Sequence, residues 1–319
     1  MDGSAAGYYL SPAPLDSASS RNSWIIELQG GGECASFEQC HAKLNTALGS
    51  SDYFAADHEF GYLLSDDARA NPRLRTWNRV HIPYCSQDLW TGRRRAASAV
   101  TFSVFFAGRH ILEAVLDHLD RTAGLATADE VILTGESAGG IGVWPNLDWL
   151  AERYPRARVT GAPIAGFYFS ASPYTGPRHT ESGLVDFREE AWPSHVALWN
   201  STADASCEAA GRAPWQCILA NETYPYIESR VFVTQSQTDK VVLLYHDWVP
   251  DQDPQHSWSA EVLAYVREWS GNMSVALDPV VATGTENGVF AAACFIHTNF
   301  SADSPLVRGR NFLGAFYDF

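Results

Sequence analysis

The chain has 319 residues, of which 46% are hydrophobic and 18% charged, and this composition is typical of a globular protein and excludes a disordered one. The formal net charge of −15 disfavours nucleic acid as a partner, because a polyanion is repelled. No uncharged apolar run approaches the roughly 20 residues that a membrane helix needs, so we expect no transmembrane segment. The one dense basic run, residues 93–95, is more typical of a solvated loop than of a binding site.

Strands and helices are predicted to alternate along most of the chain. Short apolar runs at residues 24–28, 80–83, 131–133, 159–163 and 230–234 predict buried strands. Apolar residues at helical spacing predict helices over 37–48 (with Ser36 as N-cap), 111–119 and 143–151. Alternation of this kind indicates an α/β protein with a mostly parallel sheet and helices on both faces.

The stretch 167–226 differs from the rest, because it is rich in Pro, Ser, Trp and Tyr and has little periodicity. The strand pattern resumes after it at residue 230. We therefore expect one domain over residues 1–319, with 167–226 as a lid or insertion within it.

The segment Gly135-Glu136-Ser137-Ala138-Gly139 has the pattern of a nucleophile elbow. In an elbow, a sharp strand-to-helix turn exposes the serine hydroxyl above the sheet, and glycines avoid collisions with neighbouring backbone. The pattern alone is weak, but here an apolar strand precedes it and a helical pattern follows. Ser137 is therefore the candidate nucleophile.

A serine hydroxyl needs a base to accept its proton and a carboxylate to orient that base. In elbow-containing enzymes the acid and then the histidine follow the serine along the chain. Asp239 follows the strand at 230–234, and His297 follows the apolar run 289–296, so both occupy the expected places. His246 as base and Asp247 as acid remain possible from the pattern alone.

A developing oxyanion needs fixed N–H donors. In this arrangement the residue after the nucleophile supplies one donor, and a glycine-rich loop after an early strand supplies others. Ala138 and the pair Gly31 and Gly32 fit these places, so we expect them to form the oxyanion hole.

Neither a metal nor a cofactor is expected from the spacing of the residues. The histidines are scattered, and no two cysteines have the two-residue separation typical of zinc sites. The glycines at 30–32 lack the dinucleotide fingerprint and the lysine of a phosphate-binding loop, which disfavours phosphate chemistry.

Six cysteines and four glycosylation sequons, at Asn200, Asn221, Asn272 and Asn299, favour a secreted protein whose leader lies outside this sequence. Cys207 and Cys217 are close together within the irregular stretch, so we expect a disulfide between them. The other four, Cys34, Cys40, Cys85 and Cys294, allow three connectivities that sequence does not separate. The oligomeric state is equally undetermined.

Motifs along nearly the whole chain resemble those of the pectin acetylesterases and the related Notum carboxylesterases. They are Asp2-Gly3-Ser4 with Tyr8-Tyr9, the segments 28–34, 82–92 and 135–143, the strand 231–233 with Asp239, and Ala293-Cys294-Phe295-Ile296-His297. The resemblance implies an α/β-hydrolase fold, a triad of Ser137, Asp239 and His297, and no metal. It also implies a serine carboxylesterase without a cofactor.

One residue departs from the family's pattern. Glu33 stands beside the oxyanion loop, where the family usually has an aromatic residue. A carboxylate is costly to desolvate against a fatty chain, which favours a short acyl group. We therefore expect removal of O-acetyl groups from an extracellular polysaccharide. The alternatives are a Notum-like deacylase that removes a longer chain from a protein or lipid, and a catalytically dead carbohydrate-binding relative.

Overall fold

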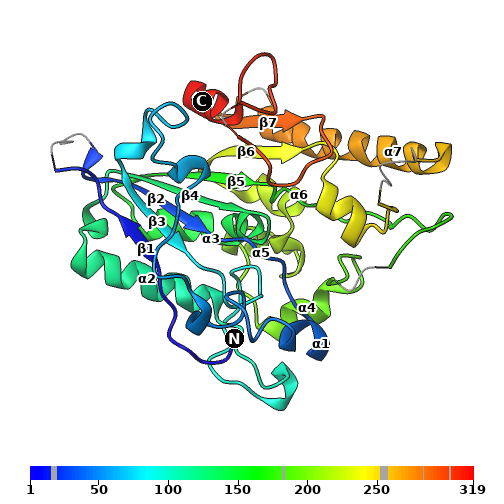
Figure 1. Cartoon of the computed structure of the whole chain (residues 1–319), viewed down its shortest axis with the longest axis horizontal. Coiled ribbons are helices and arrows are strands. Elements are labelled where there is room, and N and C mark those ends of the chain that lie inside the picture. Colours follow the sequence, from blue (N-terminus) through cyan, green and yellow to red (C-terminus); the bar gives the residue numbers. More distant parts are fainter. Residues whose placement is uncertain (16–19, 182–183, 252–257, 283, 302) are drawn as a thin grey trace.

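A computed structural model describes residues 1–15, 20–181, 184–251, 258–282, 284–301 and 303–319. Its centre is a seven-stranded sheet in the order β1-β3-β2-β4-β5-β6-β7 (Figure 1). All neighbouring strands are parallel except β1, which pairs antiparallel with β3 at the edge. This sheet confirms the predicted α/β class.

The strands match every predicted strand and extend most of them, except that β3 ends one residue before the predicted Pro83. The short edge strand β1 and the helix after residue 259 were not predicted, and β7 begins one residue before the apolar run 289–296. The strands are β1 (Tyr9–Ser11), β2 (Ser23–Leu28), β3 (Asn78–Ile82), β4 (Glu130–Glu136), β5 (Arg158–Ile164), β6 (Arg230–Ser236) and β7 (Gly288–Ala292).

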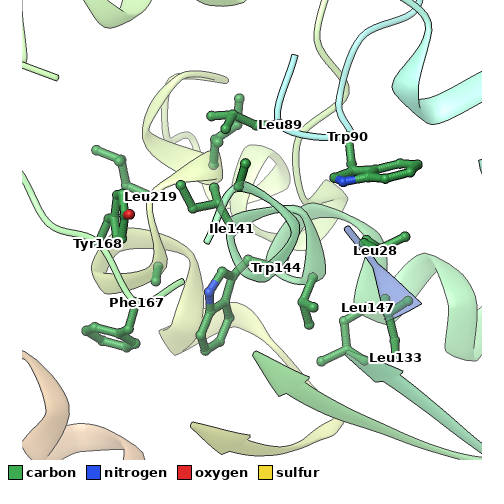
Figure 2. Close-up of a cluster of buried hydrophobic side chains, with 14 of the residues drawn as sticks. Leu28, Leu89, Trp90, Leu133, Ile141, Trp144, Leu147, Phe167, Tyr168 and Leu219 are labelled. Carbon is green, nitrogen blue, oxygen red and sulfur yellow. The ribbon is translucent and has the colours of Figure 1, made fainter. Parts of the chain in front are cut away.

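Each face of the sheet packs against a separate apolar cluster. Helices α2 (Gly108–Thr122) and α3 (Ala138–Arg153) cover one face, where their apolar side chains pack on alternate residues of β2, β3 and β4. The opposite face packs against residues 60–77 and the C-terminal helix α8 (Phe312–Asp318). Figure 2 shows part of the first cluster, in which α3 contributes Ile141, Trp144 and Leu147 next to strand and loop residues that include Leu28, Leu133, Phe167 and Tyr168.

The first helix is shorter than predicted. Ser36 caps α1 (Phe37–His41) as expected, with its hydroxyl accepting from the Gln39 amide at 3.2 Å. The helix ends at His41, and a series of turns replaces the predicted continuation to Leu48. The Thr46 hydroxyl donates to the Lys43 carbonyl at 2.7 Å, and such local side-chain bonds compete with the helical ladder.

The segment 167–226 is more helical than its sequence suggested. It lies between β5 and β6 in the chain and contains α4 (Trp192–Trp199), α5 (Ala205–Ala209) and α6 (Ala220–Thr223). The Trp199 indole donates to the Cys34 carbonyl at 2.9 Å, which ties this segment to the chain beside the glycine loop. Low periodicity arises because these helices are short and bury residues on several sides. The longest helix, α7 (Ala260–Leu277), follows β6.

Two disulfides are present in the part of the chain that the structure describes. One joins Cys207 to Cys217, and the other joins Cys34 to Cys40. Cys85 and Cys294 are free thiols. None of the described helices is both long and apolar enough to cross a membrane.

Candidate active site

Ser137 occupies the turn between β4 and α3 in a strained conformation. Its φ of 55° and ψ of −122° lie outside the regions that a residue with a Cβ normally adopts, a cost of roughly 1–3 kcal/mol. The Ser137 amide donates to the Ile164 carbonyl of β5 at 3.0 Å, which fixes the turn against the neighbouring strand. This is the geometry that the elbow pattern predicts.

The glycine loop and the elbow are in direct contact. A Cβ at Gly139 would collide with the Leu28 carbonyl, so only glycine lets α3 start this close to β2. A Cβ at Gly30 would collide with the Glu136 carbonyl and lie 3.0 Å from the Ser137 Cβ. The loop that follows β2 therefore lies against the serine, as an oxyanion loop must.

Asp239 and His297 form a hydrogen-bonded pair in which the carboxylate is buried and the imidazole is partly exposed. Both carboxylate oxygens of Asp239 lie 2.9 Å from Nδ1 of His297, and the Asp239 side chain is fully buried. Because a carboxylate accepts, Nδ1 carries the proton and Nε2 is left with a free lone pair. That Nε2 atom is buried and has no hydrogen-bond partner among the described residues.

Additional donors hold the Asp239 carboxylate. The Gln235 amide group donates to it at 3.0 Å, and the backbone amides of Val241 and Val242 donate at 3.0 and 3.2 Å. These N–H groups replace water around the buried charge, so the carboxylate is both oriented and solvated by protein. Sequence reasoning found Asp239 but not Gln235.

Tyr168 connects the serine to this pair. Burial raises the pKa of the Tyr168 phenol well above 10, the Asp239 and Glu33 carboxylates raise it further, and a hydrogen bond with the Ser137 side chain opposes the rise. Tyr168 therefore contacts the serine and lies within electrostatic reach of Asp239. An aromatic residue shortly after a strand carries no distinctive signal, which is why the sequence did not single it out.

The two alternative residues have other partners. Nδ1 of His246 lies 3.1 Å from the Val185 carbonyl, and its ring stacks on Phe187 at a centroid distance of 3.8 Å. Burial raises the pKa of Asp247 to about 7, and its Oδ2 atom has no hydrogen-bond partner among the described residues. The structure thus brings Asp239 to His297 and pairs neither alternative with them.

The expected oxyanion donors stand at the start of α3 and in the glycine loop. Gly31 and Gly32 have φ values of +143° and +77°, which are conformations that favour glycine. Within the described residues, no acceptor takes either of their N–H groups. The N–H of Ala138 begins a helix and therefore has no intrahelical acceptor.

Glu33 is a buried acid next to this loop. Glu33 is only 5% exposed, and its Oε1 atom has no hydrogen-bond partner within the described part of the chain. Burial raises the pKa of Glu33 to about 8, against an opposing effect of Lys43. Glu33 also raises the pKa of Tyr168, so it lies within electrostatic reach of the tyrosine that contacts Ser137.

Comparisons with known proteins agree with one another. The family model described as "Pectinacetylesterase" matches residues 1–314. A palmitoleoyl-protein carboxylesterase Notum from Schmidtea mediterranea is 30% identical over 305 residues, which cover 93% of this chain and 55% of that protein. Pectin acetylesterase 5 from Arabidopsis thaliana is 29% identical over 329 residues, covering 97% of this chain and 74% of the relative.

A solved structure has the same fold. The crystal structure of the Wnt deacylase Notum from Drosophila superimposes with a TM-score of 0.83 at 28% identity, over 99% of this chain and 88% of that one. The fold is therefore that of the α/β-hydrolases. The chain spans about half the length of the planarian relative and three quarters of the Arabidopsis one.

Proposed function

Because this chain belongs to the pectinacetylesterase family, we propose that it is a serine carboxylesterase that hydrolyses O-acyl esters through an acyl-enzyme. The observation that carries the proposal is the Asp239–His297 pair with a free Nε2, together with the strained Ser137, both within reach of Tyr168. A strained serine and a preoriented histidine are the two groups that acyl transfer needs.

In the proposed mechanism, the Ser137 oxygen attacks the ester carbonyl while Nε2 of His297 takes the hydroxyl proton. The N–H groups of Gly31, Gly32 and Ala138 stabilise the tetrahedral oxyanion, and each such donor contributes about 3–4 kcal/mol. The intermediate collapses when His297 returns the proton to the departing alcohol. Water, deprotonated by His297, then releases the carboxylic acid and regenerates the serine.

The Ser137 side chain lies close enough to the Tyr168 phenol to lower its pKa, and no hydrogen bond between Ser137 and His297 is present among the described residues. Catalytic hydrogen bonds often form only when substrate binds. We propose that Tyr168 holds the resting hydroxyl, which turns to His297 when an ester occupies the site.

Direct tests of the mechanism are Ser137→Ala and His297→Ala. Each is expected to lower kcat for nitrophenyl acetate by several orders of magnitude, because triad members act as a unit. Ser194→Ala, an exposed serine on α4, is the matched control and is expected to keep full activity. Labelling by a fluorophosphonate should require Ser137. An unlabelled, folded wild-type protein would favour the catalytically dead carbohydrate-binding alternative.

For the substrate, we propose an O-acetyl group on an extracellular polysaccharide. The support comes from Glu33, a buried acid within reach of the serine's neighbour Tyr168. A polar group there disfavours a fatty chain, since desolvating an unpaired carboxyl against hydrocarbon costs free energy. A longer acyl chain on a protein or lipid is the second candidate, favoured by the similarity to two Notum proteins.

Esters of graded chain length separate the two candidates. We expect nitrophenyl acetate to exceed nitrophenyl octanoate in kcat/KM, measured below the micelle concentration and without detergent. Glu33→Leu should raise the octanoate-to-acetate ratio about tenfold, within the range of about 1–3 kcal/mol per methylene, whereas the isosteric Glu33→Gln should change it little. A tenfold octanoate preference in the wild type would favour the deacylase.

We propose that residues 167–226 form a lid over this site. Tyr168, near the start of the segment, contacts Ser137, and Trp199 bonds the Cys34 carbonyl beside Glu33. The segment therefore lies next to the serine, and it is also bonded to the residues that follow the glycine loop. Shortening it is expected to alter substrate preference more than the hydrolysis of small nitrophenyl esters.

We also propose that the protein is secreted. Its two disulfides suit an oxidising compartment, and the sequon residues Asn200, Asn272 and Asn299 are exposed. Expression through a eukaryotic secretory pathway should yield a glycoprotein whose mass falls after endoglycosidase digestion. A chain of unmodified mass would count against this assignment.

A further inference from the structure

One cluster of titratable side chains has no part in the proposed mechanism. It comes from β2, β3 and the loop that joins these two strands in the chain. Glu27, His58 and His81 each offer one ligand atom, and these atoms lie within 4.8 Å of one another. Glu27 and His81 face each other in the parallel register, with Nδ1 of His81 2.6 Å from Oε2 of Glu27. The His58 ring stacks on the His81 ring at a centroid distance of 3.7 Å.

Burial makes this cluster unusual. Glu27 and His81 are each only 4% exposed. A glutamate is rarely buried this far unless it has a partner. His58 is half-buried and gives the cluster its connection to solvent. The rings of Tyr9 and Phe60 lie against His58 at centroid distances of 5.2 and 5.4 Å. The result is a polar site with aromatic walls, open at His58.

Glu136 adds a fourth group from the next strand. Glu27 pairs with Thr134 in register, and side chains two residues apart share a face, so Glu136 lies on the same face as Glu27. One oxygen of Glu136 accepts from the Gly30 amide at 3.0 Å. Its other oxygen, Oε2, is buried without a partner among the described residues. An unsatisfied buried oxygen is costly, which points to a missing partner.

We propose that Glu27, His58 and His81 bind a divalent transition-metal ion of the zinc class, with the unpartnered Oε2 of Glu136 on the same face of the sheet. Two imidazoles with carboxylate oxygens form a donor set that suits zinc, whereas magnesium and calcium prefer oxygen ligands throughout. Zinc ligands at about 2.0–2.2 Å in a tetrahedron lie roughly 3.4 Å apart. The ligand atoms of Glu27, His58 and His81 lie within 4.8 Å of one another, so small side-chain shifts bring all three to an ion.

The position of the site gives the ion a structural role. It joins β2, β3 and the loop that carries His58, and on the same face Glu136 of β4 accepts from the Gly30 amide at the start of the glycine loop. The acid and histidine of the proposed triad belong to other segments. Metal binding can be measured without an assay of ester hydrolysis, so the proposal does not rest on the proposed function.

The test is titration of the full chain, freed of metal with EDTA and dialysed, with zinc chloride in a calorimeter. We expect one zinc per chain and no comparable heat from magnesium chloride. His58→Ala should weaken the zinc Kd at least tenfold and lower the zinc content found by elemental analysis. His118→Ala, an exposed histidine on α2, is the matched control and should bind as the wild type does.

Glu27→Gln provides a second variant, because it keeps the shape of the side chain but removes its charge. It should also weaken zinc binding at least tenfold, with near-ultraviolet circular dichroism used to verify folding. If Glu27→Gln fails to fold, His58→Ala still decides, since His58 lies in a half-buried loop. Absence of zinc binding by the wild type, or binding unaffected by His58→Ala, would overturn the proposal.

Discussion

Among the described residues, two histidines pair with a buried carboxylate, and the two pairs resemble each other in local geometry. In one, Nδ1 of His297 contacts both oxygens of Asp239 at 2.9 Å. In the other, Nδ1 of His81 contacts Oε2 of Glu27 at 2.6 Å. Both carboxylates are buried. The pairs differ in what else surrounds the carboxylate.

The difference comes from the local backbone. Asp239 follows the end of β6, where the free amides of Val241 and Val242 at the next turn donate to it, together with Gln235. Glu27 lies inside β2, where the neighbouring amides are used by the sheet ladder. His81 is the partner that the described residues provide for it. A carboxylate at a strand's end is solvated by protein, whereas one inside a strand must share a proton or bind a cation.

The largest expected effect tests this difference at the triad. Asp239→Asn should lower kcat by about 10⁴, because an amide favours the wrong tautomer of the paired histidine. Glu27→Gln should lower kcat far less, since Glu27 does not contact His297. Hydrolysis of nitrophenyl acetate by both folded variants, without metal, measures this. Similar losses in the two variants would mean that the pairs act as one system.

A second effect appears in stability against pH. Folded Glu27 keeps its proton to a pH of about 8, with a pKa raised by burial from 4.5. Burial lowers the pKa of folded His81 to about 4 from 6.5. Above pH 6.5 the folded pair therefore holds one proton and the unfolded pair none. Stability should fall as pH rises from 6.5 to 8, by up to about 2 kcal/mol at 1.36 kcal/mol per unit.

Denaturant unfolding of the metal-free protein at pH 6.5 and 8 measures this loss. Glu27→Gln should remove this loss of stability, because glutamine does not titrate and His81 is neutral throughout this pH range. Glu33 titrates in both proteins, so the difference between wild type and variant reports Glu27 together with its effect on the neighbouring Glu136. An equal pH dependence in the two proteins would show that Glu27 is ionised throughout.

The smallest effect concerns the donors around Asp239. Gln235→Leu removes the side-chain donor at 3.0 Å and should lower kcat about tenfold with little change in KM, because the histidine is oriented less well. Thr238→Val is the matched control, since the Thr238 hydroxyl donates to the Cys294 carbonyl and not to Asp239. If Gln235→Leu had full activity, the backbone amides alone would suffice to hold Asp239.

Much of the fold and the candidate triad could be predicted from local rules. Apolar runs gave the positions of the strands, and the steric needs of the elbow singled out Ser137 and its glycines. The predicted order of acid and histidine pointed to Asp239 and His297. The same rules overextended the first helix to Leu48, because they did not account for the Thr46 hydroxyl, which bonds to the Lys43 carbonyl.

Other features depend on contacts between segments that are far apart in the sequence. The sequence by itself determined which residues form strands, turns and an elbow, because these depend on neighbours a few positions away. The choice of His297 over His246 rests on a contact between residues 58 positions apart, and the Glu27–His81 pair on one between residues 54 apart. Such contacts follow from strand order and register, which are set by the packing of the whole sheet. No local pattern in the sequence carries that information.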